Sequence, residues 1–144
     1  MSAPFAESRV EHDCVGALLV RDGHVLLGRR ADDRAWLPGA WDLFGGHIAP
    51  GETAEQALRR ELQEELGIAP FAMDALGELA SADGDWRLQV FAVRGWQGEA
   101  RNRQPREHAE LRWMTVTEAQ AYLSEAHPAF AAMIASAFAA ASQG

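Results

Sequence analysis

The sequence predicts an α/β protein in which a mixed sheet lies between helices, an α/β/α sandwich. Three observations lead to this expectation. Apolar runs of strand length are separated by turn signals such as Asp22-Gly23 and Asp83-Gly84. Capping boxes at Thr53 and Thr115 each begin a helical segment. Strands and helices therefore alternate along the chain.

The first elements form a hairpin. Residues 13–20 are apolar enough for a buried strand, and residues 24–29 return as a second strand after the Asp22-Gly23 turn. Residues 31–40 are expected to form a loop. Residues 41–44 are a short strand that leads into two glycines.

A helix follows. Thr53 with Gln56 makes a capping box, so the helix is expected to begin near Ala54. Gly67 suits the left-handed position just past a helix end, and Pro70 follows it. One stripe of apolar side chains on this helix is expected to face the core: Ala54, Leu58, Leu62 and Leu66.

The second half of the chain continues the alternation. Three strands are predicted, near 74–81, 86–94 and about 109–114. Thr115 and Glu118 form a capping box for a short helix over 116–123, and Pro128 lies in the first turn of a last helix. One side of that helix carries Phe130, Met133, Ile134, Ala137 and Phe138.

Length and charge limit the function. A chain of 144 residues is expected to be a single domain, residues 1–144, with a substantial core. The net charge of −8 argues against a polymeric nucleic acid or an anionic membrane as partner. A phosphorylated small molecule remains compatible, because a metal ion can supply positive charge. The oligomeric state is left open, a homodimer included.

Cysteine usage and targeting signals predict a cytoplasmic protein. The lone Cys14 excludes an internal disulfide, which fits a reducing compartment. Cys14 lies at the edge of an apolar run and is expected to be a buried small residue and not a nucleophile. No signal-peptide pattern begins the sequence, and no apolar segment is long enough to span a bilayer.

Three glutamates stand out on the predicted helix. Glu61, Glu64 and Glu65 are spaced i, i+3 and i+4, so they share one face and repel one another. They also lie in the last turns, where the helix dipole disfavours negative charge. Read alone, this could be a solvated acidic face in which Arg60 pairs with Glu64.

A divalent cation would remove that repulsion. Mg²⁺ prefers octahedral oxygen ligands and is usually held by a few carboxylates, waters and substrate phosphates, and Mn²⁺ fits the same site. Such a cation can bridge phosphate oxygens and lower the pKa of a bound water. The cluster therefore suits hydrolysis of a polyphosphate chain.

The spacing of the surrounding residues strengthens this interpretation. The fixed positions over residues 46–68 are Gly46, Glu52, Arg60, Glu61, Leu62, Glu64, Glu65, Gly67 and Ile68. They resemble the Nudix box, Gly-x5-Glu-x7-Arg-Glu-apolar-x-Glu-Glu-x-Gly-apolar, at every position. The resemblance implies a Nudix hydrolase with the same α/β/α fold.

The resemblance also implies roles. The metal ligands would be the three glutamates Glu61, Glu64 and Glu65, with the carbonyl of Gly46 as a further ligand. Arg60 would orient the catalytic glutamates through a salt bridge with Glu52. The implied reaction is attack by water on phosphorus, with a glutamate of the box or of a later loop as the base.

Two residues outside the box are further candidates. A Leu-Leu-x-x-Arg pattern ahead of the box favours Arg30 as a substrate contact, and the alternative is a surface ion pair with Asp32 or Asp33. Nudix enzymes often supply a carboxylate from the loop before the last strand. This makes Glu107 the candidate base and Glu110 the second, against the alternative of a solvated loop carboxylate.

Histidines are given no catalytic role. His108, His24 and His127 are expected at the surface, and His47 occupies a position that varies among Nudix chains. Phe44 stands where many Nudix chains have proline, which leaves the local loop shape open.

Among the tryptophans, Trp41 and Trp113 are expected in the core. Trp36 and Trp86 pack by default, with stacking on a nucleobase as the alternative.

Three functions are compatible with the sequence. The leading one is a metal-dependent pyrophosphohydrolase that releases a nucleoside monophosphate from a nucleoside di- or triphosphate, damaged nucleotides included. The second is an ADP-sugar or dinucleoside polyphosphate hydrolase. The signatures of these subtypes place a proline or a tyrosine some way beyond the box. No proline lies between Pro70 and Pro105, and the single tyrosine is Tyr122, which counts against both subtypes. The third is a Nudix fold retained as a ligand-binding module, which the intact glutamates disfavour.

Overall fold

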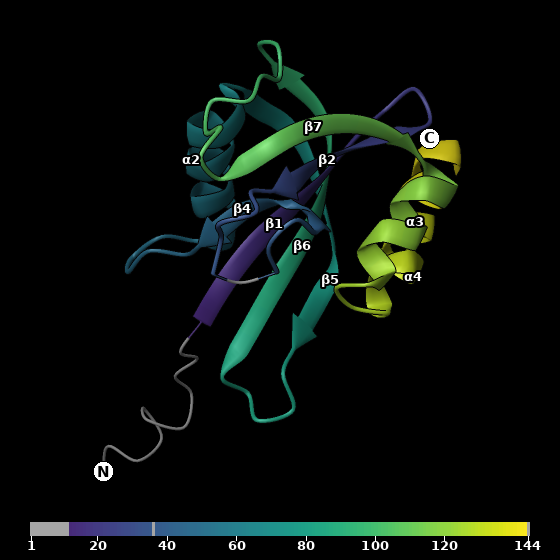
Figure 1. The fold of residues 1–144 in the computed structure, drawn as a ribbon. Helices are drawn as coiled ribbons and strands as arrows, with labels where there is room; N and C mark the ends of the chain where they lie inside the picture. The colour runs from purple at the N-terminus through teal and green to yellow at the C-terminus, as the bar shows by residue number, and fades with distance from the viewer. Residues whose placement is uncertain (1–11, 36, 144) are drawn as a thin grey trace.

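A mixed β-sheet runs through the computed structural model of the chain, which describes residues 12–35 and 37–143 (Figure 1). The strands are β1 (His12–Arg21), β2 (His24–Arg30), β3 (Trp41–Asp42), β4 (Phe44–His47), β5 (Ala69–Ala80), β6 (Trp86–Gln97) and β7 (His108–Thr115). The helices are α2 (Ala54–Leu66), α3 (Val116–Ser124) and α4 (Ala129–Gln143).

β1 occupies the middle of this sheet. Its neighbours are β2 and β4, both antiparallel, and β6, which is parallel. The order is β3-β2-β1-β6-β5, and β7 also pairs with β2. The predicted β1–β2 hairpin is confirmed, and both turn residues have positive φ angles, 53° at Asp22 and 76° at Gly23. Such a turn matches the right-handed twist of the two strands.

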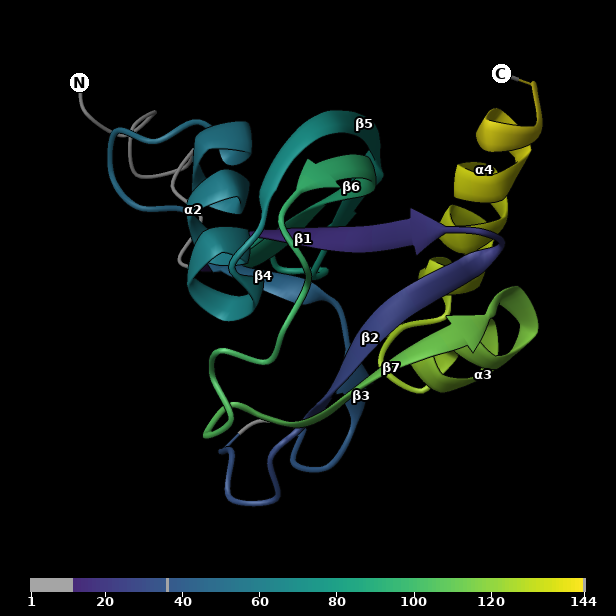
Figure 2. The same cartoon turned by 90° about the horizontal axis from the view of Figure 1, so that it is seen from above.

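Helices cover both faces of the sheet, so the predicted α/β/α sandwich is confirmed. Figure 2 shows α2 on one side and α3 with α4 on the other. Successive side chains of β1 alternate between two cores: Val15, Ala17 and Leu19 pack with α2, and Leu18 and Val20 pack with the α3–α4 side. No helix within the described residues has the length and apolar character needed to cross a membrane.

The helix ends follow the local sequence signals. The Thr53 hydroxyl accepts the Gln56 N–H at 3.1 Å, and the Gln56 side chain accepts the Thr53 N–H at 2.9 Å. Gly67 ends α2 with a φ of 71°, a left-handed value that glycine adopts at no steric cost. The capping box of Thr115 and Glu118 is likewise present at the start of α3.

The predicted apolar stripe of α2 is fully buried at Leu58, Leu62 and Leu66, and Ala54 is partly buried against the same core. Burial of these leucines holds α2 against β1, β4 and β5, the strands that it contacts most. The helix that carries the glutamates is therefore fixed to the sheet on its apolar side.

The single strand predicted over 41–44 is two strands, β3 and β4, and β4 includes both glycines. Two further strand boundaries differ from the prediction. β5 begins at Ala69 and not near residue 74, directly after α2, and β6 extends to Gln97 instead of residue 94. Pro70 thus lies inside a strand. β5 is at the margin of the sheet, where a residue without an N–H is tolerated.

The tryptophans gave one wrong prediction. Trp41 is buried as expected, but 38% of Trp113 is exposed. β7 pairs with β2 at the sheet margin, and Trp113 stacks on buried Trp96 with ring centroids 6.3 Å apart. Trp86 is partly buried against the α3–α4 core, as expected by default, and Trp36 lies outside the described residues.

Cys14 is partly buried on β1, opposite His47. Burial raises the pKa of its thiol, and the charges of Asp13 and Glu61 raise it further. A raised pKa disfavours the thiolate, which agrees with the expectation that Cys14 is not a nucleophile.

Candidate active site

The glutamates of α2 are not equivalent in the structure. The side chains of Glu61 and Glu65 are 16% and 5% exposed, whereas that of Glu64 is 50% exposed. Glu61 and Glu65 are hydrogen-bonded to each other, one helical turn apart. The helix therefore brings two of the three carboxylates into direct contact and leaves the third at the surface.

Gly46 lies directly against this pair. A Cβ placed on Gly46 would be 2.6 Å from Oε2 of Glu61, closer than a side chain tolerates. Phe44, two residues earlier, is fully buried in β4, which pairs with β1. The segment with Phe44 in place of proline thus runs as a strand whose glycine admits the Glu61 carboxylate.

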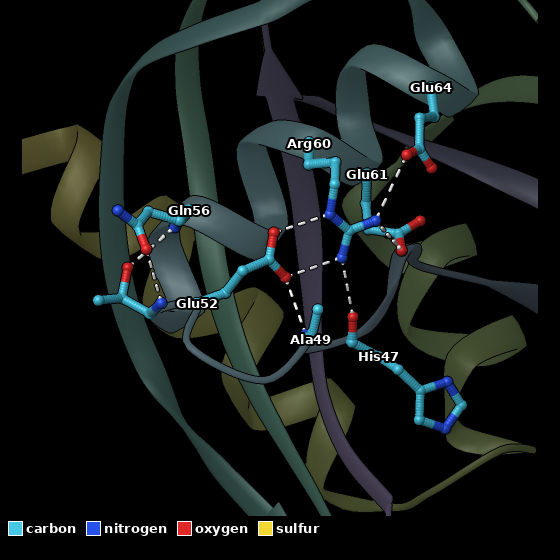
Figure 3. A network of polar contacts seen from close by, with 8 residues as sticks. His47, Ala49, Glu52, Gln56, Arg60, Glu61 and Glu64 are labelled. Atoms are coloured by element: carbon cyan, nitrogen blue, oxygen red, sulfur yellow. Dashed lines mark hydrogen bonds and ion pairs between the residues drawn. The ribbon is translucent and has the colours of Figure 1, made fainter.

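Arg60 connects the box residues. Its guanidinium makes two hydrogen bonds to Glu52, at 2.8 and 2.9 Å, and also contacts Glu61 at 3.0 Å and Glu64 at 3.4 Å (Figure 3). It donates to the carbonyl of His47 at 3.1 Å. The predicted pairing with Glu52 is present, and so is the i, i+4 contact with Glu64 that the alternative interpretation required.

The electrostatics of this network follow from the geometry. Hydrogen bonds from Arg60, followed by one from the Ala49 N–H, lower the pKa of Glu52 to about 2. The Glu52 hydrogen bond raises the pKa of Arg60. Both groups are ionised at neutral pH, so Arg60 presents a permanent cation to Glu61.

Glu65 has the opposite surroundings. Burial is the largest cause that raises the pKa of Glu65, followed by the hydrogen bond and the charge of Glu61 and by the charge of Glu107. Two carboxylates in contact in a buried place cannot both ionise cheaply without a nearby cation. The predicted repulsion therefore acts mainly between Glu61 and Glu65.

His108 contradicts its predicted position at the surface. It is 8% exposed, and its Nε2 lies 3.0 Å from Oε1 of Glu65. The prediction placed His108 in a loop, but β7 begins at this residue, opposite Arg30 and next to a register shift in β2. Burial of His108 lowers the pKa of its imidazole. Gly28 is the residue that hints at this burial, because the absence of a side chain there makes room for the His108 ring.

The other histidines match the expectation less uniformly. His24 is exposed in the hairpin. His127 is half-buried and accepts the Ala129 N–H at 3.0 Å, at the start of α4. The ring of His47 is exposed and lies 3.3 Å from that of His12, and no catalytic role is indicated for it.

Glu107 directly precedes His108, whose ring contacts Glu65 on α2, and the charge of Glu107 contributes to the raised pKa of Glu65. Its own carboxylate pairs with Arg34 at 3.1 Å and is 43% exposed. Glu110, the second candidate, is engaged by Arg29 at 3.5 Å and Arg112 at 3.0 Å. Of the two, Glu107 is the carboxylate whose charge is felt at Glu65.

Arg30 has a different partner from the aspartates considered in the sequence. Its side chain is 14% exposed and lies 3.9 Å from Asp42, while Asp32 pairs with Arg29 at 3.6 Å. Burial raises the pKa of Asp42 to about 6, although the Leu43 N–H and Arg30 lower it. The alternative considered for Arg30, a surface ion pair with Asp32 or Asp33, is therefore wrong.

Comparison with known proteins identifies the family. A family model described as a NUDIX domain matches residues 10–135. The chain belongs to the Nudix hydrolase family. The matched range covers both the helix with its glutamates and the loop with Glu107.

Among curated Nudix relatives, nucleoside triphosphatase NudI of Escherichia coli strain HS is 56% identical over 50 residues. Those residues are 35% of this chain and 36% of the relative, so the similarity extends over about a third of either protein.

Solved structures cover more of the chain. A MutT Nudix hydrolase from Burkholderia pseudomallei is 35% identical with a TM-score of 0.67, over 74% of this chain and 84% of that chain. The Escherichia coli ORF135 protein is 30% identical with a TM-score of 0.70, over 92% and 91%. The MutT structure from Aliivibrio salmonicida and Vibrio cholerae, 22% identical with a TM-score of 0.72 over 87% and 98%, supports the fold alone.

The Nudix family implies a divalent metal, and the box residues fit one. Within residues 12–35 and 37–143, no three side chains of His, Cys, Asp or Glu are already gathered closely enough to hold an ion. The buried Glu61–Glu65 pair nevertheless supplies the oxygen donors that a hard cation prefers, beside the backbone of Gly46. Glu64 would join them by leaving Arg60.

Proposed function

We propose that this Nudix chain is a metal-dependent pyrophosphohydrolase that acts on a nucleoside di- or triphosphate and releases a nucleoside monophosphate. The observation that carries the proposal is the buried contact between Glu61 and Glu65, with Arg60 bound to the outer side of Glu61. Two carboxylates held in contact disfavour each other unless positive charge is added. The name of the relative NudI, a nucleoside triphosphatase, supports the substrate class.

The proposed ligands of Mg²⁺, or of Mn²⁺ in its place, are Glu61, Glu64, Glu65 and the carbonyl of Gly46. A bound ion would neutralise phosphate charge and make a bound water more acidic. Arg60 would orient Glu61, because Glu52 grips the other edge of the guanidinium at 2.8 and 2.9 Å. The fork of an arginine suits this two-sided contact better than a lysine would.

Glu107 is the proposed general base. Its carboxylate would take a proton from the water that attacks phosphorus, and Arg34, 3.1 Å away, would position it. The same loop leads into His108 and thus into the buried contact with Glu65. The base would in this way be tied to the metal-binding helix by the first residue of β7.

Arg30 is the proposed substrate contact. Its guanidinium is largely buried beside Asp42, at the end of β2, and planar N–H groups there match phosphate oxygens. A substrate phosphate would therefore bind a guanidinium that Asp42 already positions.

The cellular setting is also a proposal. The lone Cys14 suits a reducing cytoplasm, and the net charge of −8 favours small phosphorylated molecules over polymeric nucleic acid as partners. An assay with damaged and undamaged nucleotides distinguishes the two kinds of nucleobase as substrates.

A nucleotide panel tests the proposal. Nucleoside di- and triphosphates, ADP-sugars and dinucleoside polyphosphates are incubated with the protein and Mg²⁺, Mn²⁺ or a chelator, and the products are separated. Release of a monophosphate from a nucleoside polyphosphate, abolished by the chelator, is expected. Turnover confined to ADP-sugars or dinucleoside polyphosphates, or binding without turnover, would overturn the proposed function.

A further inference from the structure

The buried polar side chains of the described part of the chain are Glu65, 4% exposed, and His108, 8% exposed. They contact each other at 3.0 Å through Oε1 of Glu65 and Nε2 of His108, and they are 43 positions apart in the sequence. A buried carboxylate needs hydrogen-bonding partners, and His108 is one that β7 supplies.

The imidazole cannot turn freely. The Phe44 ring meets it edge-on, with centroids 5.2 Å apart and planes at 76°. A Cβ on Gly28 would lie 3.1 Å from Nδ1, so even one added carbon there would press on the ring. Asn102 holds the backbone by donating to the His108 carbonyl at 2.8 Å. The surroundings therefore determine the direction of Nε2.

The contact also selects a tautomer. When the Glu65 carboxyl is ionised, or protonated on its other oxygen, Oε1 accepts and Nε2 carries the hydrogen. Nδ1 is buried and, among the residues that the structure describes, has no hydrogen-bond partner. A hydrogen on Nδ1 would be a buried donor without an acceptor, which agrees with the Nε2–H form.

We propose that His108 is a positioning residue for the metal site. By donating Nε2–H to Oε1, it fixes the rotation of the Glu65 carboxyl group and leaves its other oxygen for the contact with Glu61 and for the cation. This inference rests on the proposed function, since it assumes that Glu65 is a metal ligand. It concerns orientation and holds for Glu65 as an anion or protonated on the oxygen that faces away from His108.

Binding of Mn²⁺ alone, followed by electron paramagnetic resonance, tests the inference without turnover. Outer-sphere partners of metal ligands typically contribute about 10- to 100-fold in affinity, so His108→Leu is expected to weaken Mn²⁺ binding by that factor. His108→Gln carries an amide N–H near the place of Nε2 and is expected to recover most of the loss. His24→Gln changes an exposed histidine of the hairpin and serves as the matched control.

A second measurement does not depend on a variant that folds. Nitrogen chemical shifts of the wild-type histidines, recorded without metal, are expected to show His108 as the Nε2–H tautomer. The Nδ1–H tautomer would overturn the proposal, as would equal Mn²⁺ affinity of wild type and His108→Leu. Wild-type protein that binds no Mn²⁺ would overturn the proposed metal site and this inference together, whereas unchanged binding in the variant rejects the inference alone.

Discussion

Two glutamates one helical turn apart are held in opposite ways. Glu61 is gripped from the solvent side by Arg60, which Glu52 orients, and all three residues come from one stretch of sequence. Glu65 is held from the interior by His108, which arrives from β7. The first arrangement relies on permanent charges near water, and the second relies on burial.

The comparison shows how one helix can carry carboxylates of different character. Hydrogen bonds from Arg60, together with its charge, favour the ionised form of Glu52 and lower the pKa of that carboxyl. Burial and the nearby negative charges raise the pKa of Glu65. A cation bound beside Glu61 and Glu65 would therefore offset the burial that disfavours a negative charge on Glu65.

The largest effect is expected from the buried member of the pair. Glu65→Gln removes an anionic ligand, and because metal ligation contributes several kcal/mol, turnover should fall by about 100-fold or more. The variant should keep its melting temperature in the absence of metal, since glutamine resembles the protonated carboxyl that burial favours. Steady-state rates at saturating Mg²⁺ and thermal unfolding measure the two effects.

Glu64→Gln extends this test to the exposed glutamate. This variant should also lose most of its turnover if Glu64 joins the metal site. Glu55→Gln changes an exposed glutamate in the first turn of α2 and is the control. Near-normal rates in both Glu64→Gln and Glu65→Gln would refute the assignment of the metal ligands.

Glu107→Gln tests whether the loop before β7 supplies the general base in addition to leading into His108. General-base catalysis contributes about 100-fold or more, so turnover should fall strongly with a smaller change in KM. The acidic limb of the pH–rate profile should change too. Wild-type turnover and pH profile would move the base into the box, and Glu99→Gln, an exposed carboxylate in the same loop, is the control.

Arg60→Ala breaks the exposed arrangement. Turnover should fall by about 10-fold, as expected for a partner of metal ligands, and the melting temperature should decrease because Glu52 loses its bidentate partner. Arg60→Lys should recover only part of the loss, since an ammonium lacks the planar fork. If neither turnover nor melting temperature differs from the control Arg59→Ala, the organising role is wrong.

The last prediction concerns stability away from the glutamates and not turnover. The pKa of Asp42 is about 6 in the folded protein, above its ordinary value of 3.8, so the folded state holds a proton that the unfolded chain releases. Stability should therefore fall as pH rises from about 4 to about 6, by up to about 3 kcal/mol.

Asp42→Asn should remove that part of the pH dependence, as measured by denaturant unfolding at several pH values. Asp32→Asn, at an exposed aspartate, should keep it. An identical pH slope in wild type and Asp42→Asn would show that Arg30 compensates the buried charge fully. In that case burial would raise a carboxyl pKa at Glu65 but would have no measurable effect on stability at Asp42.

Much of the fold and the exposed half of the site could be predicted because the signals are local. The capping box of Thr53, the left-handed Gly67 and the leucine stripe define α2 within one stretch of chain. Once the helix exists, its periodicity places Glu61 beside Glu65, and Glu52 lies just ahead of the first turn, where Arg60 reaches it. The hairpin turn is equally local, since Asp22 and Gly23 alone carry its positive φ angles.

The sequence by itself thus determined the α/β architecture and the box helix, and its resemblance to the Nudix box implied the Arg60–Glu52 pair. Only the tertiary structure decided that His108 is buried against Glu65, that Arg30 faces Asp42, and that Trp113 is exposed. These three outcomes depend on how β7 and β3 pair with β2, including the register shift near Arg30. Strand register is set by contacts between distant segments, and a shift of one residue reverses which face a side chain occupies.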